Sequence, residues 1–292
     1  HPIDLLRQTF QPGIMTDYDA TAAFDRVLHA MSIVTCRRFG MPQSACLFLY
    51  NLLHNMGFHV VTGLGHSQTS FTNNEDISTP GQGVLQGSSS AAPIYNVNSD
   101  VSLATYQKLS TGAIFTHPIT KQNIQDHATQ YVDDKTDMVN LQGAVNEPLT
   151  NGDNLEILFE SANRNSNLWA ELQWMSGGDL NSSKCFSYFI DPHYDYKTES
   201  IKYSSKYKAP GDIVMTNPAM KTHTPITREE PYTARRTLGV HLAPTGNSNA
   251  QTRICIEKAE TFLGKLKHSN LNQQTKWKAI SNDGVCLEPI SA

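Results

Sequence analysis

The sequence predicts a fold of the α+β class, in which helices pack against an antiparallel sheet. The chain has 292 residues, of which 39% are hydrophobic and 17% charged, and this composition is sufficient for a buried core. Several long segments carry apolar residues at helical spacing. Between them lie short apolar runs bounded by turn residues, which are typical of strands and hairpins.

The first half of the chain is expected to alternate strands with helices. Gly40 closes the first helix, in which five apolar residues recur at helical spacing, namely Phe24, Val27, Leu28, Met31 and Val34. The expected elements are a strand at 12–20, helices at 21–40 and 41–57, hairpin strands at 58–63 and 69–74, a Gly/Ser loop at 78–90, and a helix that follows Pro93 as far as residue 109.

The second half begins with a hairpin and ends with helices. Gly177 and Gly178 end a long amphipathic helix whose apolar positions are Leu155, Leu158, Phe159, Leu168, Leu172 and Trp174. The expected elements are hairpin strands at 128–132 and 135–139, that helix at 154–178, strands at 184–191, 197–205, 212–217 and 235–244, and two helices from Asn247 onward.

Several classes of protein are disfavoured by composition. The longest apolar stretch, "ACLFLYNLL", is far shorter than the ~20 residues of a membrane span, and no secretory signal pattern opens the chain. The first residue is not Met, which indicates a piece of a longer chain. Five cysteines without a Cys-x-x-Cys pair, and scattered histidines, argue against a disulfide framework or a zinc site. An intracellular, reducing compartment is therefore expected, with nucleus and cytoplasm both open.

The charge distribution leaves a local question open. The net charge of −4 argues against a general polyanion-binding surface. Two acidic residues, Glu257 and Glu260, oppose six basic ones near the C-terminus, so the local balance is +4 (6 − 2); the basic residues are Arg253, Lys258, Lys265, Lys267, Lys276 and Lys278. This stretch is either a solvated helix face or a surface that follows a phosphate backbone.

Paired carboxylates are expected at the tip of the 128–139 hairpin. An exposed Asp-Asp is commonly a turn, but Asn-Gly is the usual pair for such a tip, so chemistry is one reason for Asp133 and Asp134 there. Asp19 ends another predicted strand. If the strands are neighbours, three carboxylates meet and repel unless cations neutralise them. Oxygen ligands select Mg²⁺, and two such ions ~3.5–4 Å apart suit nucleotidyl transfer, among other nucleotide chemistries.

The order of five motifs resembles the palm of reverse transcriptases, particularly those of retroelements. The resemblance covers roughly residues 13–243, and its motifs are "DYDATAAFD", "GQGVLQGSSSAAP", "YVDD", "SGGDLNSSKC" and "TLGV". It implies a right-hand polymerase palm with a ferredoxin-like core at 1–243, including a fingers-like portion near 40–80. It further implies a partial helical thumb or connection at 244–292, with the upstream fingers missing.

The resemblance implies catalytic roles for four residues. Asp19 and Asp133 are similar to the direct metal ligands, and Asp134 to the second hairpin aspartate that completes the metal site. Lys184 resembles the lysine that protonates the pyrophosphate leaving group, although a surface lysine after the Gly-Gly helix stop is the alternative. Asp25 is expected on a helix surface, and Asp17 is assigned no metal.

Six further residues are implied to bind substrate. Phe24 resembles the aromatic residue that rejects a ribose 2′-hydroxyl, and its alternative is a core position. Gln86 and Gly87 resemble the loop against the template and the nascent base pair, where a glycine lets nucleic acid approach the backbone. Tyr131 opens the "YVDD" motif at the same site. Leu238 and Gly239 resemble the hairpin that grips the primer end.

The implied function is RNA-directed DNA polymerisation by two-metal phosphoryl transfer. The cofactors are two Mg²⁺ ions, for which Mn²⁺ can substitute. The partners are an RNA template, a DNA or RNA primer, deoxynucleoside triphosphates and the remainder of a larger polyprotein, with no membrane. Two alternatives stay open: an inactive, truncated palm that acts as an RNA-binding or assembly scaffold, and an RNA-directed RNA polymerase, against which Phe24 and Val132 both argue.

Overall fold

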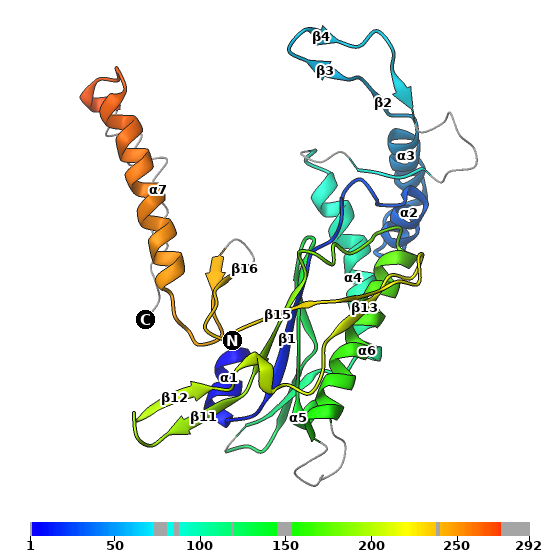
Figure 1. Cartoon of the computed structure of the whole chain (residues 1–292). Helices are drawn as coiled ribbons and strands as arrows, with labels where there is room; N and C mark the ends of the chain where they lie inside the picture. The colour runs from blue at the N-terminus through cyan, green and yellow to red at the C-terminus, as the bar shows by residue number, and fades with distance from the viewer. Residues whose placement is uncertain are drawn as a thin grey trace. The chain divides into compact units, whose positions relative to one another are not determined.

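The structure is a computed structural model that describes residues 2–72, 81–84, 88–117, 119–144, 154–237 and 240–275. It forms two compact units, one extending to Pro231 and the other starting at Tyr232. The first unit combines a central sheet with packed helices (Figure 1). The predicted combination of sheet and helices is therefore present. No helix among the described residues is both long and apolar enough to cross a membrane.

The central sheet has five strands in the order β15-β10-β1-β9-β8. Strand β1 is antiparallel to both of its neighbours, and β8 is antiparallel to β9, whereas the edge strand β15 runs parallel to β10. The expected antiparallel arrangement thus holds for four of the five strands. Their bounds are β1 Gly13–Tyr18, β8 Ala128–Tyr131, β9 Asp134–Asn140, β10 Phe186–Ile190 and β15 Thr227–Glu229.

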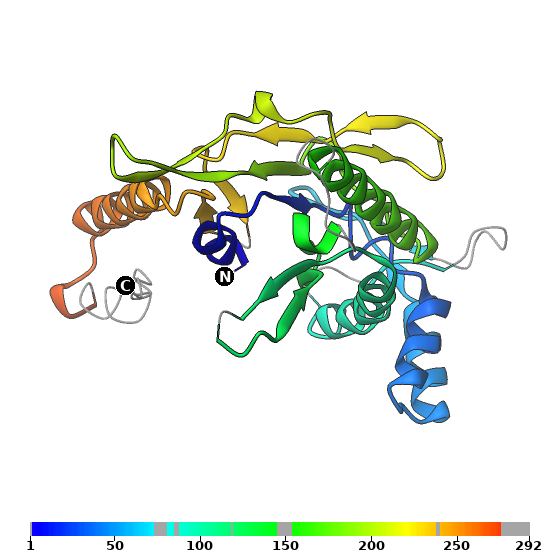
Figure 2. The ribbon, with the colours of Figure 1, turned by 90° about the horizontal axis from the view of Figure 1, so that it is seen from below.

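Both faces of the sheet pack against a hydrophobic core. Side chains alternate along each strand, so neighbouring residues of one strand contribute to different cores. All six residues of β1 are buried; Ile14 and Tyr18 join one core, and Met15 joins the other. Helices α4 (Ala91–Leu109) and α6 (Asn154–Met175) contribute Tyr106 and Trp169 to the first core, and they lie side by side (Figures 1 and 2). The second core includes side chains from α1 (Pro2–Thr9) and β6 (Ala113–Thr116).

The predicted helix at 21–40 is wrong in its first part. Residues 21–26 form turns, and α2 spans His29–Arg38. The carbonyls of Phe24 and Val27 accept hydrogen bonds from the N–H groups of Val84 and Gly83, both at 2.8 Å, so they are not available for a helical ladder. The apolar residues Phe24 and Val27 are therefore spaced as they are because both pack into the core from a turn, and not because they lie on one face of a helix.

The predicted hairpin at 58–74 is divided into two short ladders. Strand β2 (Gly57–Phe58) pairs with β5 (Phe71–Thr72), and β3 (Val61–Thr62) pairs with β4 (Gly65–His66). Between them, the Ser67 hydroxyl accepts from the Val60 N–H and donates to the Thr69 carbonyl, which interrupts regular pairing. The preceding helix α3, Gln43–His54, agrees with prediction except that it ends three residues before Gly57.

Several short elements differ from the predictions or are absent from them. The strand expected at 235–244 is a hairpin, in which β16 (Arg235–Thr237) pairs antiparallel with β17 (Val240–Leu242). Strand β6 pairs with β7, which carries polar residues on an exposed ribbon and therefore gives no apolar signal. The remaining elements are α5 Leu141–Ala144, β7 Asn123–Asp126, β11 Pro192–Asp195, β12 Ser200–Tyr203, the 3-10 helix η1 Lys206–Lys208, β13 Val214–Thr216 and β14 His223–Pro225.

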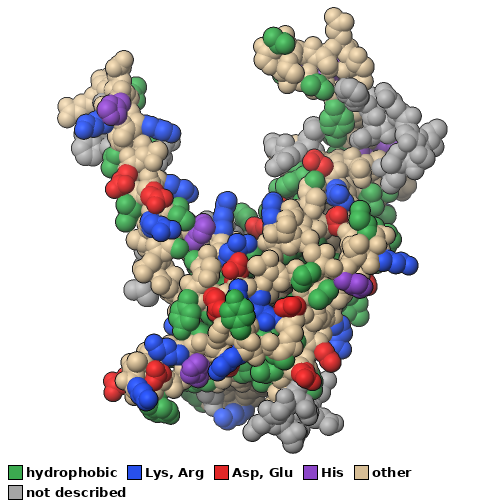
Figure 3. Space-filling model, viewed as in Figure 1, with side chains coloured by type: hydrophobic (Ala, Val, Ile, Leu, Met, Phe, Trp, Pro, Cys, Tyr) green, Lys and Arg blue, Asp and Glu red, His purple; other side chains and the backbone are tan. Residues whose placement is uncertain are grey.

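The second unit contains the hairpin β16–β17 and helix α7, which spans Asn249–His268. Basic and acidic side chains are spread along α7 (Figure 3), and most of its residues are exposed while Leu266 is buried. An exposed helix with mixed charges is compatible both with a solvated helix face and with a surface that follows a phosphate backbone. Lys276 and Lys278, which belong to the second predicted helix, lie outside the described residues.

We expect Gly177→Ala to destabilise the first unit by about 1–3 kcal/mol, because a positive φ is strained for residues with a Cβ. Gly177 has φ +90°, and an added Cβ would lie 2.6 Å from Leu28 Cγ and 2.8 Å from the Arg26 carbonyl oxygen. Urea unfolding monitored by circular dichroism measures the change. Gly63→Ala is the matched control, since nothing lies within 4 Å of its added Cβ; equal effects of the two substitutions would contradict the prediction.

Candidate active site

Asp19 and Asp134 lie at the same end of two neighbouring strands. Asp19 directly follows β1, and Asp134 is the first residue of β9. In the antiparallel register of these strands, Tyr18 faces Lys135. Continuing that register by one residue puts Asp19 opposite Asp134, and residues opposite each other project from the same face of a sheet. The sequence prediction that these two carboxylates belong together is consistent with this geometry.

The hairpin that carries Asp133 has a strained tip. Its two turn residues are Val132 and Asp133, whereas the predicted tip was Asp133 and Asp134; Asp134 instead pairs with Tyr131 in the ladder. Val132 has φ +55°, a conformation that β-branched residues rarely adopt and that costs about 1–3 kcal/mol. The Gln130 side-chain amide donates to the Val132 carbonyl at 2.8 Å and supports the turn. Strain of this kind at a carboxylate pair points to a functional constraint.

Lys184 lies beside Asp19. Its ammonium is 3.3 Å from the Asp19 carboxylate, and the two side chains are 64% and 29% exposed. A β-bridge between Ala20 and Leu180, together with a 2.9 Å hydrogen bond from the Asn181 N–H to the Asp19 carbonyl, brings the Lys184 turn to the end of β1. An ion pair this exposed adds little stability. The pair does, however, place the Lys184 ammonium, which can donate a proton, next to the Asp19 carboxylate.

Asp17 is engaged inside the sheet. It is buried, and its carboxylate accepts a hydrogen bond from the hydroxyl of Thr136, which is directly opposite in β9. It lies two residues before Asp19 on the same strand, so the two carboxylates share a face. Asp25 is exposed in the 21–26 turn.

Phe24 is half-buried in the turn that follows Asp19, and its ring lies 5.3 Å from the ring of Tyr95. Burial, with smaller contributions from the charges of Asp133 and Asp134, raises the pKa of Tyr95 to about 12. Tyr95 on α4 therefore links the Phe24 turn electrostatically to the hairpin carboxylates. Sequence reasoning missed Tyr95, although it belongs with Ala91, Ile94 and Asn98 to the buried stripe of α4.

Four of the predicted substrate-binding residues lie outside the described part of the chain: Gln86, Gly87, Leu238 and Gly239. The segment 81–84, which ends two residues before Gln86 in the sequence, is hydrogen-bonded to the Phe24 turn. Tyr131 ends β8 with 68% of its surface exposed.

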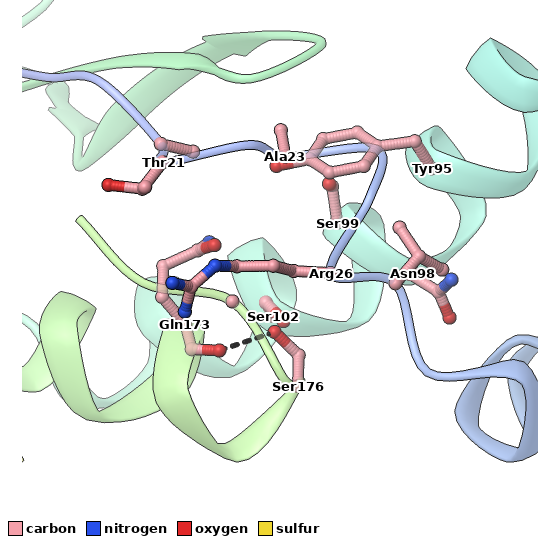
Figure 4. Close-up of a pocket in the computed structure, with 12 residues that line it drawn as sticks. Thr21, Ala23, Arg26, Tyr95, Asn98, Ser99, Ser102, Gln173 and Ser176 are labelled. Carbon is pink, nitrogen blue, oxygen red and sulfur yellow. Dashed lines mark hydrogen bonds between the residues drawn. The ribbon is translucent and has the colours of Figure 1, made fainter. Parts of the chain in front are cut away.

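A small pocket lies between the 21–26 turn, α4 and the end of α6 (Figure 4). Arg26 extends into it toward Gln173, and its guanidinium is 3.7 Å from the Asp179 carboxylate. The Ser176 hydroxyl donates to the Gln173 carbonyl at 2.8 Å. The Ser176 bond closes the end of α6, whereas the Arg26–Asp179 pair and the 2.8 Å hydrogen bond from the Thr21 N–H to the Asp179 carbonyl join the turn to the residues that follow this helix.

A buried charged cluster lies directly beneath the hairpin, and sequence reasoning missed it. The Lys135 ammonium is 3.1 Å from the Asp137 carboxylate and lies over three aromatic rings, at 4.4 Å from Tyr18, 3.6 Å from Tyr106 and 4.6 Å from Trp169. Asp137 also accepts hydrogen bonds from the hydroxyls of Tyr18, at 3.0 Å, and Tyr106. Both charges are therefore compensated inside the core.

Burial dominates the ionisation behaviour of this cluster. It lowers the pKa of Lys135 to about 8, against the opposing effect of the Asp137 charge. It also raises the pKa values of Tyr18 and Tyr106 well above the ordinary value, with Asp137 adding to both shifts. The two phenols consequently stay protonated and donate to Asp137 at neutral pH.

The oxygen donors at this sheet end fit Mg²⁺ by chemistry, because hard carboxylate oxygens are its preferred protein ligands. Among the residues that the structure describes, no three His, Cys, Asp or Glu side chains are grouped closely enough to hold a metal ion. Mg²⁺ commonly takes one or two carboxylates and completes its coordination with water and substrate phosphates. The assignment of Asp19, Asp133 and Asp134 as ligands stays a prediction from the sequence, and one or two of these carboxylates are enough for Mg²⁺.

Comparisons with known proteins yield structural neighbours alone. No protein-family model matches the sequence, and no curated protein matches it. Telomerase from Candida tropicalis, in complex with a TWJ fragment of telomeric RNA, has a TM-score of 0.38 and 14% identity over 70% of this chain and 32% of that chain. A C-terminally truncated apo telomerase from the same organism has a TM-score of 0.30 and 16% identity over 69% and 38% of the two chains.

Telomerase from Candida albicans, also with a TWJ fragment of telomeric RNA, has a TM-score of 0.30 and 12% identity over 69% and 32% of the two chains. The neighbours are thus telomerases, a family of reverse transcriptases, and this chain spans about a third of their length. Similarity at this level does not assign the chain to that family or to retroelements.

We expect Asp137→Ala to destabilise the first unit by about 3–5 kcal/mol, because it leaves the buried Lys135 charge without its carboxylate partner. Chemical denaturation at pH 7 measures the loss. Asp212→Ala is the matched control: it breaks the 3.2 Å pair with Arg228, whose side chain is 12% exposed but keeps its 2.9 Å hydrogen bond to the Lys206 carbonyl, and because Asp212 is 68% exposed a loss of about 0–1 kcal/mol is expected. A loss at Asp137 as small as that at Asp212 would contradict the account of the cluster.

Proposed function

We propose that this chain is an RNA-directed DNA polymerase domain that adds deoxynucleotides to a primer 3′-hydroxyl. The proposal rests on the pairing of β1 with β9, which leaves Asp19 at the end of one strand and the Asp133–Asp134 hairpin at the start of the other, and on the ion pair of Lys184 with Asp19. The order of the five motifs supports the same reaction class. Nucleotidyl transfer depends mainly on positioning and electrostatic stabilisation, for which charged side chains held at a sheet end are suited.

Each residue of the sheet end has a distinct proposed role. Asp19 and Asp133 hold Mg²⁺, and Asp134 completes or supports the site. When bound, two metal ions stabilise the attacking and leaving oxygens of an in-line displacement. Lys184 donates a proton to the pyrophosphate leaving group, for which its place beside Asp19 is suitable.

The partners follow from the reaction. An RNA template and a DNA or RNA primer form a duplex that the protein recognises mainly by shape and backbone. Deoxynucleoside triphosphates are the second substrate. We propose further that the chain derives from a retroelement polyprotein and works in a reducing intracellular compartment, which its unpaired buried cysteines support.

We expect Asp133→Asn to abolish Mg²⁺-dependent primer extension, because a neutral amide oxygen binds Mg²⁺ more weakly than a carboxylate and does not offset its charge. The assay supplies an RNA template, an annealed DNA primer, deoxynucleotides and Mg²⁺, and it measures primer elongation by the full chain and the variant. Asp25→Asn is the control, since it removes an exposed carboxylate of the nearby turn, and it should extend as the parent does.

Two outcomes would contradict this proposal. Undiminished extension by Asp133→Asn would exclude the metal-ligand assignment. Absence of extension from the parent chain, under conditions in which it binds the template-primer, would favour the RNA-binding or assembly scaffold. Preference for ribonucleotides by the parent would instead favour the RNA-directed RNA polymerase.

We expect Phe24→Ala to admit ribonucleotides, because the ring that would clash with a 2′-hydroxyl is removed. The ring of Phe24 is supported by Tyr95 at 5.3 Å, so its position is defined rather than adaptable. The ratio of kcat/KM for deoxynucleotides and ribonucleotides measures the effect, with Phe24→Tyr as the control that keeps the bulk. An unchanged ratio in Phe24→Ala would reduce Phe24 to a packing residue.

A further inference from the structure

The side chains of β9 divide into two chemical sets. Asp134 and Thr136 project from one face of the sheet, while Lys135 and Asp137 project from the other. The first face carries the Thr136–Asp17 hydrogen bond and the carboxylates of the candidate active site. The second face meets α4 and α6, where Lys135 and Asp137 are buried. Which set faces the active site depends entirely on the register of β9.

A register shift of one residue would exchange the two sets. Because the side-chain period of a strand is two, such a shift turns every side chain to the opposite face. Asp134 would then point toward the helices, and Lys135 would enter the carboxylate site. The shift would therefore separate Asp134 from Asp19 without breaking the sheet.

The hydrophobic pattern cannot prevent this shift in the first half of β9. The strand reads "DKTDMVN", so its first four residues are polar on both faces, and apolar residues begin at Met138. Register is weakly specified in strands that are polar on both faces. In the part of β9 nearest the candidate active site, something other than the hydrophobic pattern must therefore fix the register.

The buried charged cluster fixes the register, because its partners come from three different elements. The Lys135 ammonium lies within 5 Å of the ring centroids of Tyr18 on β1, Tyr106 on α4 and Trp169 on α6. The two phenol hydroxyls that donate to Asp137 come from β1 and α4. All of these contacts are lost together if β9 moves by one residue, and each charge would then be left without its partners.

Selection of one β9 register also explains why the buried cluster consists of charged side chains. Replacing a buried ion pair by apolar residues of similar volume is often neutral or stabilising, so stability alone does not require charges here. The best-attested use of such buried polar groups is the selection of one register.

We propose that Lys135 and Asp137 are positioning residues, whose buried pair sets the register of β9 on β1 and so holds Asp134 on the same sheet face as Asp19. The register itself is a property of the fold. Its consequence for catalysis rests on the proposed polymerase function.

The test uses the double substitution Lys135→Leu/Asp137→Leu, which removes both charges and leaves neither one unpaired. Met15 and Met138 lie directly opposite each other in β1 and β9 and face the same core, so they report the register. With ¹³C-methyl-labelled methionine, the parent should give one NOE between these two methyl groups. The double variant should remain folded by circular dichroism and yet lose this NOE or give a second set of signals.

Primer extension is measured on the same samples. A displacement of the carboxylates by about one ångström or more is expected to lower extension about 100-fold. Val139→Ala is the matched control, since it shortens a buried side chain on the same face of the same strand, and it should keep both the NOE and extension. If the double variant does not fold, Lys135→Met/Asp137→Asn replaces it and is judged by the same NOE, because it also leaves no charge unpaired while the amide oxygen can accept from the two phenols.

The outcomes separate this proposal from the proposed function. A folded double variant with the single Met15–Met138 NOE unchanged would overturn the register role. A changed register with undiminished extension would overturn the positioning role. Absence of extension from the parent would contradict the polymerase function alone, because the NOE measurement decides the register without any activity.

Discussion

The antiparallel pairing of β1 with β9 is the contact on which the rest of the site depends. It joins Asp19 to Asp134 across more than a hundred residues of chain, and closing a loop of that length carries an entropic cost that local contacts do not repay. Burial of all six residues of β1 between two cores provides the compensating gain. Because side chains alternate, the same pairing sends Tyr18 toward the helices and leaves Asp17 and Asp19 on the other face.

Several features near the β8–β9 hairpin lower the stability of this end of the sheet. Val132 has a strained backbone, and Lys135 and Asp137 carry charges into the core. The exposed Lys184–Asp19 pair contributes little in return. The compensation comes from the aromatic rings around Lys135 and from helices α4 and α6, whose long apolar faces lie against the sheet. The helical layer therefore supports an end of the sheet that is weak by itself.

Sequence reasoning succeeded where one periodicity dominated. Helices α3, α4 and α6 and the β8–β9 hairpin were predicted because their apolar spacing and turn residues agreed. It was wrong at 21–28, because the carbonyls of Phe24 and Val27 bond to the 81–84 segment, a partner that no local pattern reveals. Lys135 and Asp137 were missed since charged residues in a strand are ordinarily exposed. Their burial depends on rings contributed by distant helices.

The places where local rules fail are concentrated at the candidate site. Val132, Lys135 and Asp137 lie within a stretch of six residues; Val132 departs from the backbone preference of β-branched residues, and Lys135 and Asp137 both place a charge in the core. A strand selected for stability would avoid all three, with a turn residue such as Gly at the tip and apolar residues beneath it. Because natural sequences depart from local consistency mainly at functional positions, this concentration beside Asp133 and Asp134 argues for a constrained chemical site.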